Sequence, residues 1–289
     1  MMNNFAVFIL THGRADNVKT YDSLKRCGYT GKIYILIDNE DSTCDMYYER
    51  FGDEVIMFDK PKEAEAIDVG DNFDGRTAIV YARNACFRIA KELGIKYFLQ
   101  LDDDFKSFQW RYAERRKMKV IECRHLDKLF EHIVQFLESS GALTVALAQG
   151  GDFIGGVKAN NFKKSLLRKA MNTFFCSVDR PFKFFGRLSE DVCAYTVYGS
   201  RGDLMFTIPK VMITQVPTQA GKGGISEVYL TTGTYVKSFY PVMYSPSCVK
   251  ISMMGDNHKR IHHKVIWNNC CPKIIDEKWR KTSEGKYNI

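Results

Sequence analysis

The chain has 289 residues, 45% of them hydrophobic, and a formal net charge of +8. This length and composition exclude an intrinsically disordered chain and leave room for one large α/β domain or two small ones. The N-terminal residues lack the basic segment and cleavage site of a signal peptide, and no stretch approaches the ~18 apolar residues of a membrane span. Nine cysteines without a C-x-x-C pair predict reduced, mostly buried thiols. We therefore expect a soluble cytoplasmic protein with no membrane partner.

Strands and helices alternate along the first third of the chain. An apolar run at residues 5–10 predicts a buried strand, and a polar turn from Thr11 to Asn17 leads into a helix with apolar residues three apart. Further strands are predicted at residues 32–37 and 55–58, followed by a helix within residues 76–93. This alternation predicts a mainly parallel sheet whose ligands bind outside the carboxyl ends of its strands.

The next apolar run, residues 97–101, ends in three consecutive carboxylates, Asp102, Asp103 and Asp104. Because side chains alternate along a strand, we expect Asp102 and Asp104 on one side and Asp103 on the other. Three like charges repel at a sheet end unless a cation or strong hydrogen-bond donors lie among them. Oxygen ligands of this kind suit Mn²⁺ or Mg²⁺ that also binds a substrate phosphate. An acidic turn after a strand is the simpler alternative.

Beyond the carboxylates the local signals are weaker. The charge run at residues 111–117 is typical of a solvated loop or hairpin, and an amphipathic helix is predicted at residues 126–137. A strand at residues 143–148 precedes a glycine-rich stretch, which either approaches a ligand closely or is a flexible loop. Another strand is predicted at residues 211–216. No internal repeat or low-complexity linker separates these elements.

The distribution of charge is uneven. Residues 1–104 hold 13 Lys and Arg against 19 Asp and Glu, a net charge of −6, which leaves 29 against 15, or +14, for residues 105–289. This asymmetry indicates that the later part faces a polyanion, of which nucleic acid is the commonest. An ordinary solvated, lysine-rich surface is the alternative explanation.

Glu190 and Asp191 form the only adjacent acidic pair between residue 105 and the far tail. Ser189 before them is predicted to cap a helix, and negative charge at a helix start is favourable. The same pair could instead supply a catalytic base. Since successive helical residues point about 100° apart, only one of the two carboxylates would reach a substrate. From the residues alone both interpretations stay open.

Three of the six histidines fall within residues 258–263. Clustered histidines favour a metal site, although surface histidines are commoner. If His262 and His263 lie on a strand, we expect them to face opposite sides, so that at most one of them meets the carboxylate site.

A resemblance follows from the order of these parts. With a strand-turn-helix beginning, Ala82-Arg83-Asn84 on a helix and a following strand that ends in Leu101-Asp102-Asp103-Asp104, the chain resembles the GT-A fold of nucleotide-sugar glycosyltransferases over about residues 4–200. More narrowly, it is similar to the phage glycosyltransferases that modify hydroxymethylated pyrimidines in DNA, including those associated with TET/JBP-type dioxygenases. The resemblance implies the host cytoplasm for a phage-encoded enzyme.

The implied fold is α/β and GT-A-like: a Rossmann-like, mostly parallel sheet flanked by helices, with a basic acceptor-binding C-terminal part. We expect a single domain over residues 1–289. Residues 1–104 would be its nucleotide-sugar half, and residues 105–289 its acceptor half and tail. The number of subunits is not predicted.

The resemblance also implies roles for individual residues. Asp102 would contact the ribose or the metal shell, Asp104 would ligate Mn²⁺ or Mg²⁺, and His262 or His263 would complete that shell. Glu190 and Asp191 would supply the base of an inverting enzyme, with Asp191 the better candidate. The implied nucleotide-sugar-binding residues are Thr11, Arg14, Asp38, Arg83, Asp102 and Asp103.

The acceptor half would bind DNA, and the donor would be a UDP-sugar. A base in a duplex must leave the stack to be modified, so the enzyme must hold the flanking phosphates. Basic residues suited to this contact are Lys163, Lys164, Arg168, Lys169, Arg180, Lys183 and Arg187, interleaved with phenylalanines that core packing explains equally well.

Three other functions are compatible with parts of the sequence. A nucleotidyltransferase shares the early strand and acidic metal site, but it usually has a glycine-rich phosphate loop that Thr11 to Arg14 do not form. A non-catalytic nucleic-acid-binding protein would keep the basic charge, although three aspartates are a poor choice beside DNA. A metal-dependent nuclease would need an additional Lys or Glu motif that we do not find.

Overall fold

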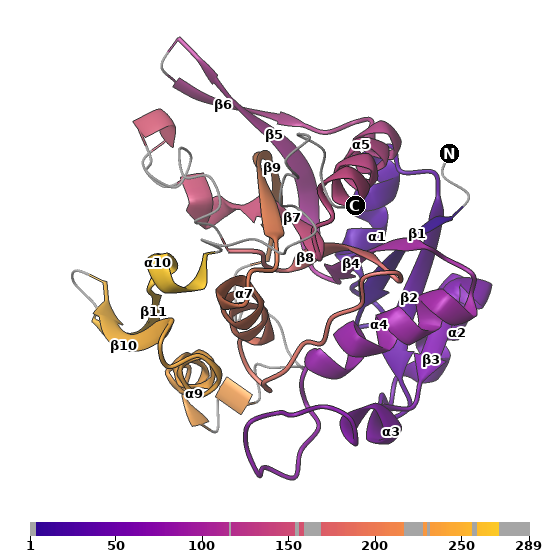
Figure 1. Ribbon diagram of the computed structural model, residues 1–289. Coiled ribbons are helices and arrows are strands. Elements are labelled where there is room, and N and C mark those ends of the chain that lie inside the picture. The colour runs from indigo at the N-terminus through magenta and orange to yellow at the C-terminus, as the bar shows by residue number, and fades with distance from the viewer. Residues whose placement is uncertain are drawn as a thin grey trace, which may run out of the picture.

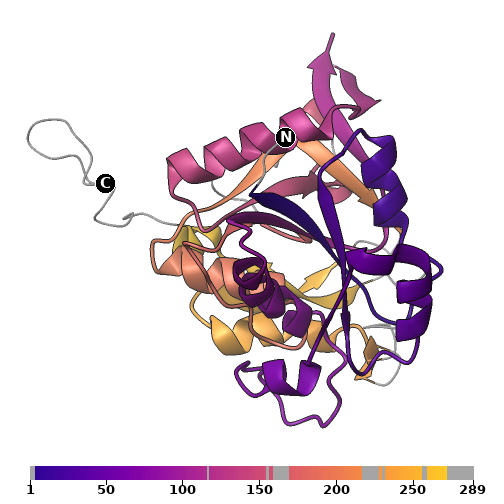
Figure 2. The same cartoon turned by 90° about the vertical axis from the view of Figure 1, so that its right-hand side faces the viewer.

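The computed structural model describes residues 4–115, 117–153, 156–158, 169–216, 228–229, 232–255 and 259–271. Within these ranges a nine-stranded sheet forms the centre of the molecule, with helices on both faces and a two-stranded sheet beside it (Figures 1 and 2). We find there no helix with the length and hydropathy that a membrane span requires. All nine cysteines are unpaired and seven are buried, as the sequence predicts.

The central sheet is mixed, with most of its strands in one direction. In chain order its strands are β1 (Phe5–Leu10), β2 (Lys32–Asp38), β3 (Val55–Phe58), β4 (Tyr97–Asp102), β5 (Phe105–Glu114), β6 (Lys117–Glu122), β7 (Thr144–Gln149), β8 (Thr173–Ser177) and β9 (Met205–Gln215). Their order across the sheet is β3-β2-β1-β4-β8-β7-β9-β5-β6. Only β5 and β8 run against the rest of these described strands, so seven of nine are parallel in direction. The predicted α/β class with a mostly parallel sheet flanked by helices is confirmed.

Helices cover the sheet on both sides. One face packs against α1 (Lys19–Arg26), α2 (Cys44–Phe51) and α5 (Leu126–Ser140), and the other against α3 (Lys60–Ala64), α4 (Val80–Glu92) and α7 (Glu190–Ser200). In β1, Val7 and Ile9 belong to the first core and Ala6 and Phe8 to the second. Because both faces are covered, this strand is apolar along its whole length rather than alternating.

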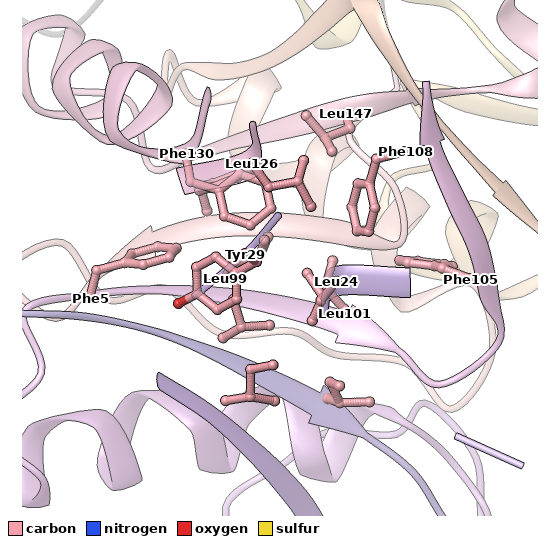
Figure 3. Close-up of a cluster of buried hydrophobic side chains, with 14 of the residues drawn as sticks. Phe5, Leu24, Tyr29, Leu99, Leu101, Phe105, Phe108, Leu126, Phe130 and Leu147 are labelled. Atoms are coloured by element: carbon pink, nitrogen blue, oxygen red, sulfur yellow. The ribbon is translucent and has the colours of Figure 1, made fainter. Parts of the chain in front are cut away.

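The first of these cores holds the sheet that carries the site (Figure 3). The ring of Phe130 on α5 lies 6.1 Å from that of Phe5 and 5.2 Å from that of Phe175, measured between centroids. These side chains are fully or almost fully buried, and each contributes about 1.5–3 kcal/mol to stability. The core therefore anchors β1 and β4 side by side and fixes the position of the residues that follow them.

The last part of the chain packs around α7 (Figure 1). It consists of β10 (Val249–Met254) and β11 (Arg260–Val265), which pair antiparallel, with the helical turns η4 (Val236–Ser238), α9 (Tyr240–Tyr244) and α10 (Trp267–Cys270). A Cβ atom on Gly199 of α7 would collide with the carbonyl oxygen of Cys270. Glycine at this position therefore allows α10 to lie directly against α7.

Asp71, in the loop before α4, is bound by one residue that precedes α7 and by one residue of the last part of the chain. Arg187 pairs with Asp71 at 2.8 Å, and the hydroxyl of Tyr240 donates a hydrogen bond to the same carboxylate at 2.5 Å. The Arg187 guanidinium also donates to the carbonyl oxygens of Phe73 and Gly75. These contacts hold Asp71 at a junction between the two halves of the chain.

Most predicted elements form, with shifted ends. The charge run forms the β5–β6 hairpin, which projects from the body of the molecule (Figure 1). The predicted strand at residues 211–216 is longer and begins at Met205, because β9 pairs with β7 before it pairs with β5. The helix expected within residues 76–93 begins at Val80.

Candidate active site

Polar side chains gather where β1, β2 and β4 end. Asp103, in the turn after β4, is almost fully buried and accepts hydrogen bonds from the hydroxyl of Thr11 at 2.8 Å and the guanidinium of Arg14 at 3.0 Å. These contacts join the turn after β1 to the turn after β4. Thr11, Arg14 and Asp103, three of the predicted nucleotide-sugar residues, are therefore brought together.

Asp102 faces a different partner, Arg83 of α4. The guanidinium Nη2 donates to Asp102 Oδ1 at 2.9 Å, and Nε donates to Glu190 Oε1 at 2.8 Å. Arg83 is 1% exposed, and its guanidinium lies 4.8 Å from the ring centroid of Phe174. Its Nη1 is buried and has no hydrogen-bond partner among the described residues. Arg83 thus connects the end of β4 to the start of α7, and its Nη1 donor is not used by these contacts.

The three aspartates are electrostatically strained. Burial raises the pKa of Asp102 to about 7; Arg83 opposes this shift, while Asp104 and Glu190 add to it. Burial also raises the pKa of Asp104 to about 6, with a further contribution from Asp103. No described side chain donates a hydrogen bond to the Asp104 carboxylate. A cation beside Asp102 and Asp104 would relieve this repulsion.

The predicted alternation of side chains along Asp102, Asp103 and Asp104 does not hold, because only Asp102 belongs to a strand. Strand β4 ends at Asp102, so Asp103 and Asp104 lie in a turn. Different partners nevertheless separate Asp102 from Asp103, since Arg83 binds the first, and Thr11 and Arg14 bind the second.

Asp38, at the end of β2, is buried beneath two residues that sequence reasoning missed. Its Oδ2 lies 2.8 Å from His12 Nδ1, and its Oδ1 accepts from Lys60 Nζ at 3.1 Å. Although burial raises the pKa of Asp38, its hydrogen bond to His12 and the charge of Lys60 lower it below its ordinary value. The His12 side chain is 38% exposed, so it is more available to a ligand than Asp38. The sequence signal that could have identified His12 is its position in the polar turn from Thr11 to Asn17, directly after the first strand.

Glu190 and Asp191 are the first two residues of α7, and their carboxylates have different surroundings. Glu190 binds Arg83, whereas Asp191 lines a cavity and accepts a hydrogen bond from the amide of Val192 at 2.7 Å. Burial, together with the charge of Glu190, raises the pKa of Asp191 to about 7. Ser189 precedes α7 as predicted, but its side chain does not cap the helix: the residue has φ 55°, and its hydroxyl donates to the carbonyl of Lys237 and accepts no hydrogen bond from the helix amides.

The cavity beside Asp191 has a volume of about 500 Å³ and is bounded by α7, η4, β11 and α10. His262 and His263 both line it, with ring centroids 4.2 Å apart. The expectation that they face opposite sides of the strand is therefore wrong. Alternation directs the Cα–Cβ bonds, but rotation about the side-chain torsions lets both rings lean to the same side.

The predicted metal and DNA ligands are only partly assembled. Among the described residues, no three or more His, Cys, Asp or Glu side chains form a group that could hold a metal ion. The histidines thus do not join Asp102 and Asp104 in such a group. Of the predicted DNA-binding residues, Lys169 lines the cavity, whereas Arg187 is buried against Asp71 and is not available to a phosphate. Lys163, Lys164 and Arg168 lie outside the described residues.

A family model described as TET-associated glycosyltransferase matches residues 5–224. The chain belongs to the TET-associated glycosyltransferase family. The predicted glycosyltransferase activity is confirmed, and the nucleotidyltransferase, nuclease and non-catalytic alternatives are set aside. No curated protein matches this TET-associated glycosyltransferase.

Solved structures similar to this TET-associated glycosyltransferase include three other transferases. Glucosyl-3-phosphoglycerate synthase from Mycobacterium tuberculosis, with Mn²⁺, UDP and phosphoglyceric acid, has 10% identity and a TM-score of 0.44, covering 91% of this chain and 87% of its own. S. aureus TarS 1–349 with UDP has 11% identity and a TM-score of 0.43, covering 83% and 64%. The mannosyltransferase PcManGT from Pyrobaculum calidifontis, with GDP-Man and Mn²⁺, has 12% identity and a TM-score of 0.45, covering 83% and 73%. These similarities are distant, and the family match identifies the enzyme.

Proposed function

We propose that this glycosyltransferase transfers a sugar from a UDP-sugar to a hydroxymethylated pyrimidine in DNA, with the help of Mn²⁺ or Mg²⁺. The observation that carries the proposal is the chain of contacts from Asp102 through Arg83 to Glu190. It couples the acids at the end of β4, where a nucleotide-sugar would bind, to the acids at the start of α7. A donor and an acceptor bound at these two places would meet beside Arg83.

The donor would lie at the carboxyl ends of β1, β2 and β4. Thr11 and Arg14 hold Asp103 in place, and Asp38 orients His12. These contacts position backbone and side-chain groups around the space that a nucleotide would occupy outside the strands. We assign Thr11, Arg14, Asp103 and His12 to the border of this space.

The chemistry of the donor set fits a divalent metal. Asp102 and Asp104 offer carboxylate oxygens, and two such ligands suffice for Mg²⁺ or Mn²⁺ when diphosphate oxygens and water complete the shell. When bound, the metal would neutralise charge on the departing diphosphate. Nη1 of Arg83, which has no partner in the described part of the chain, would donate a hydrogen bond to the same anion.

Asp191 is assigned as the base. The oxygen of the acceptor hydroxyl forms a bond to the anomeric carbon, the bond from that carbon to the diphosphate oxygen breaks with its electron pair leaving on UDP, and the hydroxyl proton passes to Asp191. A pKa near 7 suits a carboxylate for this task. Glu190 is engaged by Arg83 and is assigned a positioning role.

Two surface features support a DNA acceptor. Residues 105–289 carry a net charge of +14. The projecting β5–β6 hairpin exposes Trp110, Tyr112 and Ile121 beside basic residues such as Lys119, and a two-stranded ribbon of this kind fits the major groove. Phosphate contacts would provide most of the affinity, which would then fall steeply with rising salt.

The test is a turnover screen with the whole chain. The protein is incubated with Mn²⁺ and a panel of UDP-sugars, and UDP release is followed with hydroxymethylcytosine DNA, with unmodified DNA and without DNA. The proposal expects release that hydroxymethylcytosine DNA stimulates and EDTA abolishes. Equal release with modified and unmodified DNA would refute the acceptor, and full turnover in EDTA would refute the metal.

A further inference from the structure

The cavity beside Asp191 has an unusual balance of charge. Its lining includes three lysines, Lys169, Lys237 and Lys264, and a single carboxylate, Asp191. Among the described residues no carboxylate lies within ion-pair distance of any of the three ammonium groups. A concave surface of this kind attracts an anion, because a cleft with low-dielectric walls focuses the field of several like charges.

We propose that this cavity is a phosphate-binding subsite that receives the acceptor nucleotide after it has turned out of the duplex. The inference rests on the function proposed above and deepens it. Lys169 and Lys237 would bind the phosphate of the extruded nucleotide, and His262 and His263 would line its path.

One polar atom of the residues that line the cavity lacks a hydrogen-bond partner among the described residues. The Nδ1 atom of His263 is buried without a hydrogen-bond partner among the described residues. The Lys237 ammonium lies 5.2 Å from the ring centroid of Tyr229, and burial and the charge of Arg260 lower its pKa. Buried polar groups are usually paired, so the unpaired Nδ1 of His263 indicates a missing hydrogen-bonding ligand.

The shape and the aromatic lining suit a nucleotide. Tyr195 and Trp267 both line the cavity, and their rings stack on each other with centroids 5.6 Å apart and an interplanar angle of 12°. Enzymes that modify bases hold the extruded base by stacking on aromatic side chains. A volume of about 500 Å³ lies within the range of small-molecule sites.

The position of the cavity favours the acceptor nucleotide, rather than the donor diphosphate, as its occupant. The residues that border the donor space follow β1, β2 and β4, and none of them lines the cavity. Asp191 does line it, and Glu190 beside Asp191 is bound by Arg83, which also binds Asp102. A hydroxymethyl group in the cavity would therefore lie between the assigned base and the donor site.

The experiment measures binding to the full chain by calorimetry without donor or metal. The probes are 5-hydroxymethyl-2′-deoxycytidine 5′-monophosphate and the nucleoside that lacks the phosphate. Wild-type protein should prefer the monophosphate, and Lys237→Ala and Lys169→Ala should each reduce that preference about tenfold, the effect of one charged hydrogen bond. Affinity for the nucleoside should stay the same. Lys237→Arg, which retains the charge, should keep most of the preference.

The matched control is Lys250→Ala, which removes the same charge from an exposed position on β10 outside the cavity and should behave as wild type. Thermal unfolding of each variant checks that it folds. Equal wild-type affinity for the two probes would overturn the inference. So would a loss of UDP affinity in Lys237→Ala with unchanged monophosphate binding, because the cavity would then hold the donor. If hydroxymethylcytosine DNA proves to be no acceptor while the phosphate preference persists, the proposed function fails and the phosphate site stands.

Discussion

Replacing Arg83 by alanine should destabilise the protein as well as inactivate it. The side chain is 1% exposed and forms ion pairs with Asp102 at 2.9 Å and Glu190 at 2.8 Å. Removing one partner from a buried pair leaves an uncompensated charge and costs about 3–5 kcal/mol. Here two carboxylates lose their partner at once, although the Asp102 side chain is 24% exposed and water can compensate it in part. We therefore expect a loss of about 3–5 kcal/mol rather than twice that.

The measurement is the free energy of unfolding in urea, with the unfolding temperature as a second readout. For a chain of this size, the loss corresponds to a drop of roughly 6–20 °C. Arg83→Lys should lose about 1.5–3 kcal/mol, because an ammonium group cannot reproduce the fork that reaches both carboxylates. Adding Glu190→Gln to Arg83→Ala should recover part of the stability, since it removes one stranded charge.

Arg88→Ala is the matched control on the same helix. Arg88 also binds two glutamates, Glu63 and Glu92, but its side chain is 46% exposed, and exposed pairs contribute about 0–1 kcal/mol. If Arg83→Ala costs no more than Arg88→Ala, the coupling between β4 and α7 through Arg83 is not the structural link argued above. The same reasoning fails if Glu190→Gln adds to the damage of Arg83→Ala instead of relieving it.

Three further predictions concern chemistry and pH. Asp104→Asn should abolish metal-stimulated UDP release while leaving the unfolding temperature within a few degrees, and metal-stimulated turnover of this variant would count against Asp104 as a ligand. Asp191→Asn should lower sugar transfer by about 10²- to 10⁴-fold with unchanged affinity for the UDP-sugar, so near-normal transfer would require another base. The hydrogen bond to Asp38 raises the pKa of His12 above its ordinary 6.5, so the stability that His12 contributes is present below pH 6.5 and lost as pH rises through the raised pKa. The difference in unfolding temperature between wild type and His12→Asn should accordingly shrink from pH 6 to pH 8.5, and a constant difference would contradict this pairing.

The local features of this protein follow from its sequence because they depend on neighbours along the chain. The apolar run of β1 and the carboxylates after β4 are contiguous, and the parallel-sheet rule then places their ends at one edge. That reasoning placed Thr11, Asp38 and Asp102 at this edge, and the register of β1 with β2 and β4 has them there. The order of these parts was also sufficient to predict the enzyme family.

The pairing of distant residues was decided only by tertiary packing. Arg83 and Glu190 are 107 positions apart, and no periodicity indicates that α4 and α7 cover the same face of the sheet. The backbone of Ser189 takes a left-handed conformation, and its hydroxyl turns to Lys237, so a pattern based on residue type predicted a cap that does not form.

The same holds for the histidines and Asp191. Sequence reasoning assigned His262 and His263 to the metal, but packing of β11 and α10 against α7 puts them in the cavity that Asp191 lines. A strand pattern specifies which way each Cβ points, whereas the neighbours of a side chain depend on how elements from remote parts of the chain close around it. The sequence by itself therefore determined the sheet, its acidic edge and the class of enzyme, and the tertiary structure decided which carboxylate pairs with Arg83 and which one lines the cavity.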